Sequence, residues 1–98
     1  MYKFSLSIRA YHIGRRYGLP HFEEWGKLPP ETMQAACLKA ADNVLTRHGG
    51  RSTAIELYRA AGFGIYQIGL IMCGEDVDID YIRKICGRVD KNLHESLN

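Results

Sequence analysis

The chain has 98 residues, of which 46% are hydrophobic and 24% charged, and its formal net charge is +2. This length suits one domain, and this balance is typical of a globular chain rather than a disordered one. The longest apolar run, residues 63–73, has about half the ~20 residues that a membrane-spanning helix needs. Residues 1–12 lack the sustained apolar stretch of a secretory signal, so we expect a cytoplasmic protein without membrane association.

The N-terminal third predicts one helix and a connector. Residues 2–8 alternate as in a strand, but a helical pattern over residues 6–17 explains more positions, with Ser5 or Ser7 as its cap. Residues 18–30 contain three prolines and two glycines, which predicts a connector with one helical turn at its HFEEW stretch.

Two helices are predicted next. Residues 31–48 are rich in alanine and carry one apolar stripe, and a Gly-Gly pair follows as a stop. Residues 51–61 predict a shorter helix that is capped by Ser52 or Thr53. If Thr53 is the cap, Glu56 stands where it completes a capping box.

The last third predicts an apolar segment, an acidic turn and a further helix. The apolar segment covers residues 64–73 and the helix covers residues 79–87, with Asp78 and Asp80 at its start. Residues 89–98 form either a frayed last helix or a docking arm. We therefore expect a single all-α domain, a compact helical bundle with the following parts: an N-terminal helix and Pro-rich connector (1–30), a core (31–88) and a tail (89–98).

Part of this core carries apolar and small residues in the register of a known family. The positions that carry it are Thr53, Leu57, Ala61-Gly62, Phe63, Ile68, Ile71, Gly74 and Ile79-Asp80 with Ile82. Residues 53–86 thereby resemble the helix-turn-helix core of the lambda-repressor and Cro family. The resemblance implies that residues 32–48 form the first helix of the bundle and that residues 64–73 form a DNA-reading helix. It also implies a regulator that is often dimeric.

Two departures weaken the DNA-binding interpretation. Tyr58 stands where the family usually has alanine, so its ring would widen the helix crossing or point elsewhere. The base-reading places hold apolar residues or glycine, namely Ile65, Tyr66, Gly69 and Leu70, and only Gln67 offers an amide. Base edges in the major groove are matched by polar side chains, and each polar group buried without a partner costs about 1–3 kcal/mol. The segment is therefore core, a protein interface or a DNA contact.

Electrostatics single out the N-terminal helix. Residues 1–30 carry five bases and two acids, a local charge of +3, which falls short of the strongly basic face of a protein held on DNA by phosphate contacts. On a helix, Arg9, His12 and Arg16 share a face, with Arg15 next to it. That face meets a phosphate backbone, meets an acidic partner surface or is simply solvated.

No catalytic or metal-binding constellation is predicted. The three cysteines, Cys37, Cys73 and Cys86, form no CxxC pair. The acidic run that begins at Asp76 lacks the glycine and the final glutamate of a calcium loop, because these places hold Tyr81 and Gly87. No glycine-rich phosphate loop is present, and we expect neither enzymatic activity nor a cofactor.

The leading hypothesis is a small non-catalytic protein-binding regulator, inhibitor or adaptor of the phage or mobile-element type. Its partner would be a host protein, part of a nucleic-acid machine. The residues expected to meet the partner are Ile65, Tyr66, Gln67, Leu70, Arg9, His12, Arg15 and Arg16. The alternative hypothesis is a sequence-specific DNA-binding transcriptional regulator of the lambda-repressor and Cro type. The sequence leaves the partner's identity and the oligomeric state open.

Overall fold

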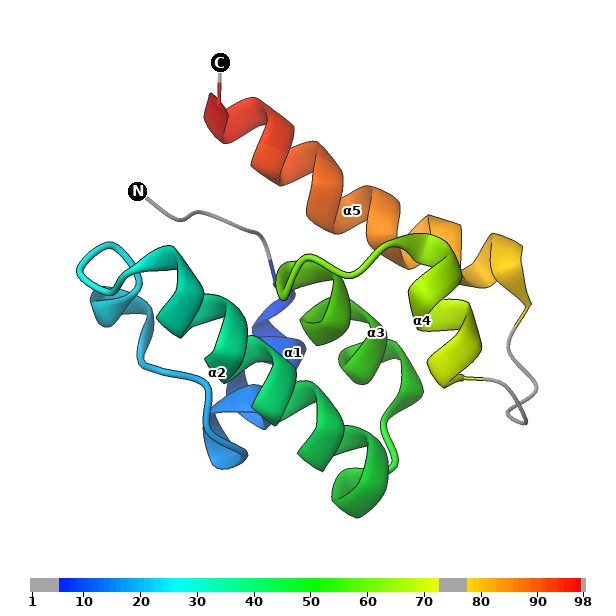
Figure 1. Ribbon diagram of the computed structural model, residues 1–98, viewed down its shortest axis with the longest axis horizontal. Coiled ribbons are helices and arrows are strands. Elements are labelled where there is room, and N and C mark those ends of the chain that lie inside the picture. Colours follow the sequence, from blue (N-terminus) through cyan, green and yellow to red (C-terminus); the bar gives the residue numbers. More distant parts are fainter. Residues whose placement is uncertain (1–5, 73–77, 98) are drawn as a thin grey trace.

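The computed structural model describes residues 6–72 and 78–97, and within them the chain is all-α (Figure 1). The predicted fold class is confirmed. The elements are α1 (Ile8–Arg16), η1 (Phe22–Glu24), α2 (Pro30–Asn43), η2 (Val44–His48), α3 (Arg51–Ala60), α4 (Ile65–Ile71) and α5 (Ile79–Leu97). Predictions that concerned Ser5, Cys73, Gly74 and Asp76 lie outside the described residues.

Helix α1 begins where the sequence placed a cap. The Ser7 hydroxyl accepts a hydrogen bond from the Ala10 N–H at 3.1 Å, which satisfies one of the unpaired donors of the first turn. Gly18 follows the helix with a φ of 115°, a left-handed conformation that glycine adopts without strain. The connector then makes its one helical turn, η1, as predicted.

The predicted capping box of α3 is wrong. Its first turn is already formed at Gly50, whose carbonyl accepts the Ala54 N–H at 3.0 Å, so Thr53 lies inside the helix and is buried. Glu56 is buried as well, and its carboxylate serves another helix. The Ser7 N–H and hydroxyl donate to the two Glu56 oxygens at 3.1 and 3.0 Å. A negative charge is thus held at the N-terminus of α1, where the helix dipole favours it.

Helix α2 keeps the apolar stripe expected of it. Met33, Cys37, Ala40 and Ala41 are all buried, and Pro30 occupies the first turn, where its missing N–H costs nothing. The helix widens at its end into the π-helical turn η2. There the Gly49 N–H donates to the Val44 carbonyl oxygen at 2.7 Å, and the helix stops at this glycine as predicted.

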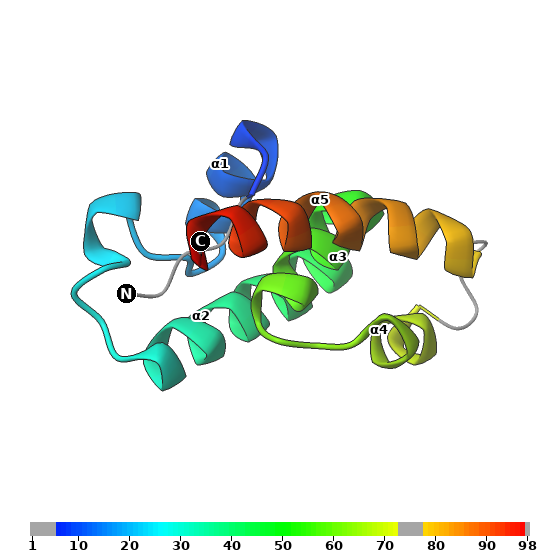
Figure 2. The same cartoon turned by 90° about the horizontal axis from the view of Figure 1, so that it is seen from above.

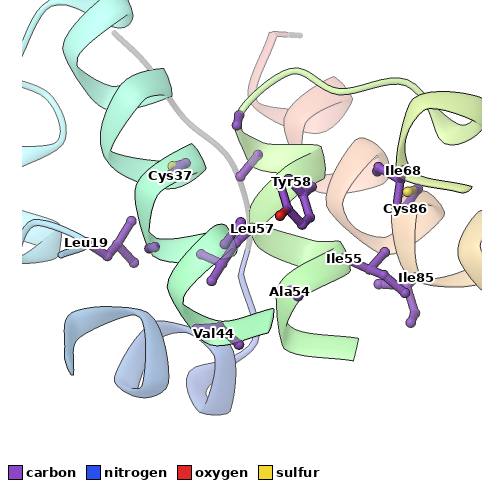
Figure 3. Packing of buried hydrophobic residues seen from close by; sticks show 14 of the residues in the cluster. Leu19, Cys37, Val44, Ala54, Ile55, Leu57, Tyr58, Ile68, Ile85 and Cys86 are labelled. Atoms are coloured by element: carbon purple, nitrogen blue, oxygen red, sulfur yellow. The ribbon is translucent and has the colours of Figure 1, made fainter. Parts of the chain in front are cut away.

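Helix α3 is the centre of the bundle, since α1, α2, α4 and α5 all pack against it. Seven of its ten residues are buried, which is typical of a helix enclosed on every side. Figure 3 shows how its side chains leave in different directions: Ile55 points toward Ile85 of α5, whereas Leu57 points toward α2 and the connector. The core is therefore continuous through α3.

The ring of Tyr58 is accommodated inside the bundle rather than turned away from it. The residue is buried, and its hydroxyl donates to a carboxylate oxygen of Asp42 on α2 at 2.5 Å. Its ring centroid lies 5.4 Å from that of Phe63, in the segment between α3 and α4. Tyr58 thus spans the contact between α2 and α3, where an alanine would leave space for a closer crossing.

Helix α5 is longer than the predicted helix at residues 79–87. It starts as expected, because the Tyr81 N–H donates to the Asp78 carboxylate at 2.7 Å, and it continues without a break through Gly87 to Leu97. Glycine inside a helix costs only about 1 kcal/mol relative to alanine. That cost is offset by burial of Ile82, Ile85 and Val89 along one side of the helix.

The link between Ser7 and Glu56 can be tested by a double-mutant cycle. We expect Glu56→Ala to lower the free energy of unfolding by about 1–3 kcal/mol, because it removes a buried acceptor of two hydrogen bonds. Ser7→Ala in the Glu56→Ala background should cost clearly less than Ser7→Ala alone. Urea unfolding followed by circular dichroism measures each value. Strictly additive losses would contradict the proposed coupling of α1 to α3.

Candidate functional site

Helix α4 is set up by glycine and by one glutamine. The segment from Ala61 to Gly64 joins it to α3, and Gly62 has a φ of 95°. The Gly64 N–H donates to the side-chain oxygen of Gln67 at 2.7 Å, so Gln67 closes the first turn of its own helix. The only amide among the predicted base-reading residues is therefore engaged locally. A glutamine three residues after an N-cap glycine is the sequence signal for this bond.

The apolar residues of α4 divide into two faces. Ile68, and Met72 just after the helix, are buried against the core, and Ile65 is half-buried there. Tyr66 and Leu70 are 70% and 77% exposed. Because they are four residues apart, their side chains lie on the same face of the helix. The core interpretation thus holds for Ile68 and Met72 but not for Tyr66 and Leu70.

An open apolar groove lies beside this exposed face. It has a volume of about 410 Å³ and is lined by Tyr66, Gly69 and Leu70 of α4 and by Ile79 and Ile82 of α5. A side chain at Gly69 would place its Cβ 3.5 Å from the end of Ile79, so glycine leaves this space open between the helices. We call it the α4–α5 groove. Sequence reasoning missed its α5 wall, because the approach of α5 depends on the tertiary packing.

One edge of the α4–α5 groove is polar. Arg83 donates from one guanidinium nitrogen to the Tyr66 hydroxyl at 3.3 Å, and another nitrogen lies 3.6 Å from the Asp80 carboxylate. Both charged side chains are solvent-exposed, so the ion pair adds little to stability. Its role is positional: Arg83 bridges α5 to the ring that forms one wall of the groove.

The basic residues predicted for the same surface lie elsewhere. Arg9, His12, Arg15 and Arg16 are all exposed on α1, and Arg15 donates to the Leu19 carbonyl oxygen at 2.9 Å. Helix α1 packs on α2 and α3, whereas α4 packs on α3 and α5. Figure 2 shows α1 and α4 on opposite sides of α5. The expectation of one combined docking surface was therefore wrong, because the enclosed helix α3 separates its two halves.

Other kinds of site find little support in the geometry. Among the side chains that the structure describes, no three His, Cys, Asp or Glu residues gather as a metal site would require. In residues 6–72 and 78–97, no helix is long and apolar enough to cross a membrane. Comparisons of the chain with protein-family models, with curated proteins and with solved structures gave no match.

The thiol of Cys37 illustrates why no nucleophile is assigned. It is fully buried between α2 and the rest of the core, and burial raises its pKa to about 12 from the ordinary 9.0. A thiol is nucleophilic as the thiolate, so Cys37 is inert at neutral pH. In a Cys73→Ser background, we expect a disulfide reagent at pH 8 to modify Cys37 only after urea unfolding. Rapid modification of the folded chain would contradict this burial.

The same shift makes stability depend on pH in a defined direction. Because the pKa of Cys37 is higher in the folded chain, its contribution is complete below about pH 9 and is lost as pH rises toward 12. Between pH 8 and about pH 10.5, ionisation of the unfolded thiol should lower the free energy of unfolding by about 2 kcal/mol. Urea unfolding of Cys37→Ala should lack this part of the decline.

Proposed function

We propose that this chain is a non-catalytic regulator that docks on a partner protein through the α4–α5 groove. The observation that carries the proposal is the exposure of Tyr66 and Leu70, 70% and 77%, at the wall of an apolar groove. An aromatic and an aliphatic side chain exposed together beside a concave surface are typical of a protein-protein contact. An inhibitor or adaptor acts by occupying a surface, so it needs no catalytic centre.

The energetics support a partner that covers both side chains. Complete burial of a large apolar side chain contributes about 1.5–3 kcal/mol. Gly69 keeps the bottom of the groove open, so an apolar side chain of the partner can enter between Leu70 and Ile79. Arg83 and the Tyr66 hydroxyl at the edge supply polar contacts. This arrangement of apolar centre and polar edge is what stable protein interfaces share.

The same residues are poorly suited to the alternative, a sequence-specific DNA-binding regulator. Tyr66 and Leu70 would cover polar base edges without matching their donors and acceptors. Gln67 has a suitable amide, but its oxygen already accepts the Gly64 N–H. We therefore place DNA readout second. A partner from the host's nucleic-acid machinery, met in the cytoplasm, remains part of the proposal and follows from the helix-turn-helix resemblance alone.

The test compares two exposed aliphatic residues on different helices. Leu70→Asp places a charge in the α4–α5 groove, whereas Ile8→Asp, at a residue that is 79% exposed on α1, is the matched control. A partner captured from nuclease-treated host lysate is first identified by mass spectrometry and purified. We expect Leu70→Asp to weaken its dissociation constant by at least about 30-fold, as an interface anchor would. Ile8→Asp should leave it unchanged.

Circular dichroism and thermal unfolding accompany both variants. Because Leu70 is exposed, Leu70→Asp should keep its helical content and its Tm. Unfolding of this variant would mean that Leu70 belongs to the core. Unchanged partner binding would remove the α4–α5 groove from the interface. Saturable binding to one duplex DNA sequence, lost in Leu70→Asp, would favour the DNA-binding alternative instead.

A further inference from the structure

A second surface lies on the other side of the molecule, where the connector folds back on α1. Tyr11 is its centre, and its ring makes edge contacts with four other rings. The centroid distances from Tyr11 are 5.4 Å to His12, 6.4 Å to His21, 6.1 Å to Phe22 and 5.6 Å to Trp25. We call these five residues the aromatic surface.

Hydrogen bonds and core contacts fix this arrangement. The Phe22 N–H donates to the Tyr11 hydroxyl at 3.1 Å, and the Trp25 ring N–H donates to the Pro20 carbonyl oxygen at 3.0 Å. Tyr11 and Trp25 are partly buried against the hydrophobic core. The rings are therefore held in place before any ligand arrives, which lowers the entropic cost of binding.

Phe22 is the ring that folding does not explain. It is 57% exposed, and it packs against His21 with a centroid distance of 4.5 Å and an angle of 32° between the ring planes. Two rings in near-parallel contact thus reach the solvent at η1. A flat, exposed ring next to a second ring is the kind of platform on which an unpaired nucleobase stacks.

Helix α1 supplies the opposite charge to a phosphate backbone. Its nine residues include Arg9, Arg15 and Arg16 and no acid, and the exposed His12 belongs to the aromatic surface as well. Two exposed glutamates, Glu23 and Glu24, follow Phe22 on η1. They disfavour phosphates beyond the ring and leave the side of α1 as the path for a strand.

We propose that the aromatic surface and the basic side of α1 together bind single-stranded nucleic acid. One base stacks on Phe22, and the phosphates next to it meet Arg9 and Arg16. A duplex keeps its bases stacked on each other and offers no free face to Phe22. An acidic peptide would use the arginines but would gain little from an exposed ring. The site lies on the opposite side of α5 from the α4–α5 groove and does not depend on the function proposed above.

The chain contains its own probe for this site. Trp25 is its single tryptophan and lies 5.6 Å from Tyr11, so its fluorescence reports on the aromatic surface. The full chain is titrated with a mixed-sequence DNA strand of about 12 nucleotides, within the usual site size for such proteins. We expect saturable quenching that weakens as salt rises. The matched duplex should bind at least about tenfold more weakly.

Variants separate stacking from charge. Phe22→Leu keeps an apolar side chain but loses the flat ring, and should weaken binding about fivefold or more, whereas Phe22→Tyr should bind like the original chain. The double variant Arg9→Gln with Arg16→Gln should lower the slope of log affinity against log salt by about 1.4. Glu23→Gln with Glu24→Gln should bind more tightly. Leu70→Asp, far from this surface, should bind normally.

Three results would overturn the proposal. The first is an absence of saturable quenching at low salt. The second is equal binding by Phe22→Leu and Phe22→Tyr, because the ring would then contribute nothing. The third is competition by a polyglutamate peptide as effective as that by the unlabelled strand, which would make the surface a site for acidic proteins. Circular dichroism of each variant shows that the fold is kept.

Discussion

The enclosure of α3 is the constraint on which the rest of this structure depends. Seven of its ten residues are buried, so every other α-helix must cover some part of it. Its two polar buried groups follow from this position. Glu56 is stabilised only because Ser7 of the α1 cap supplies two donors, and Tyr58 because Asp42 of α2 accepts its proton. Such groups would be costly in the core without these partners, and with them they fix how α1 and α2 are placed.

Local signals were enough to predict most of the helices. Proline and glycine mark the ends of α2, and a serine marks the start of α1, because these residues act on the backbone within one turn. The role of Glu56 could not be predicted in this way. Its partner lies 49 residues away in the chain, so the nearby threonine offered a false capping box. The length of α5 was missed for a related reason, since burial along α3 outweighs the small cost of Gly87.

The candidate site shows the same division between local and tertiary information. The sequence indicates that residues 64–73 are apolar, but Ile68 and Leu70 look alike until the helix is placed on its neighbours. Only packing shows that the first is core and the second is exposed. The groove needs α5 as its second wall, and the basic helix proves to be on another side of the bundle. In contrast, the aromatic residues of the connector were visible in the sequence, but their contacts with Tyr11 were not.

The separation of α1 and α4 has a consequence for how this protein can change over time. Each helix reaches the core through a few buried side chains, and α3 stands between them. Exposed positions on one helix can therefore be replaced without disturbing the other, so the two sides are free to evolve at different rates. A chain of this size rarely has room for two independently adjustable surfaces, and an enclosed middle helix is what makes that room.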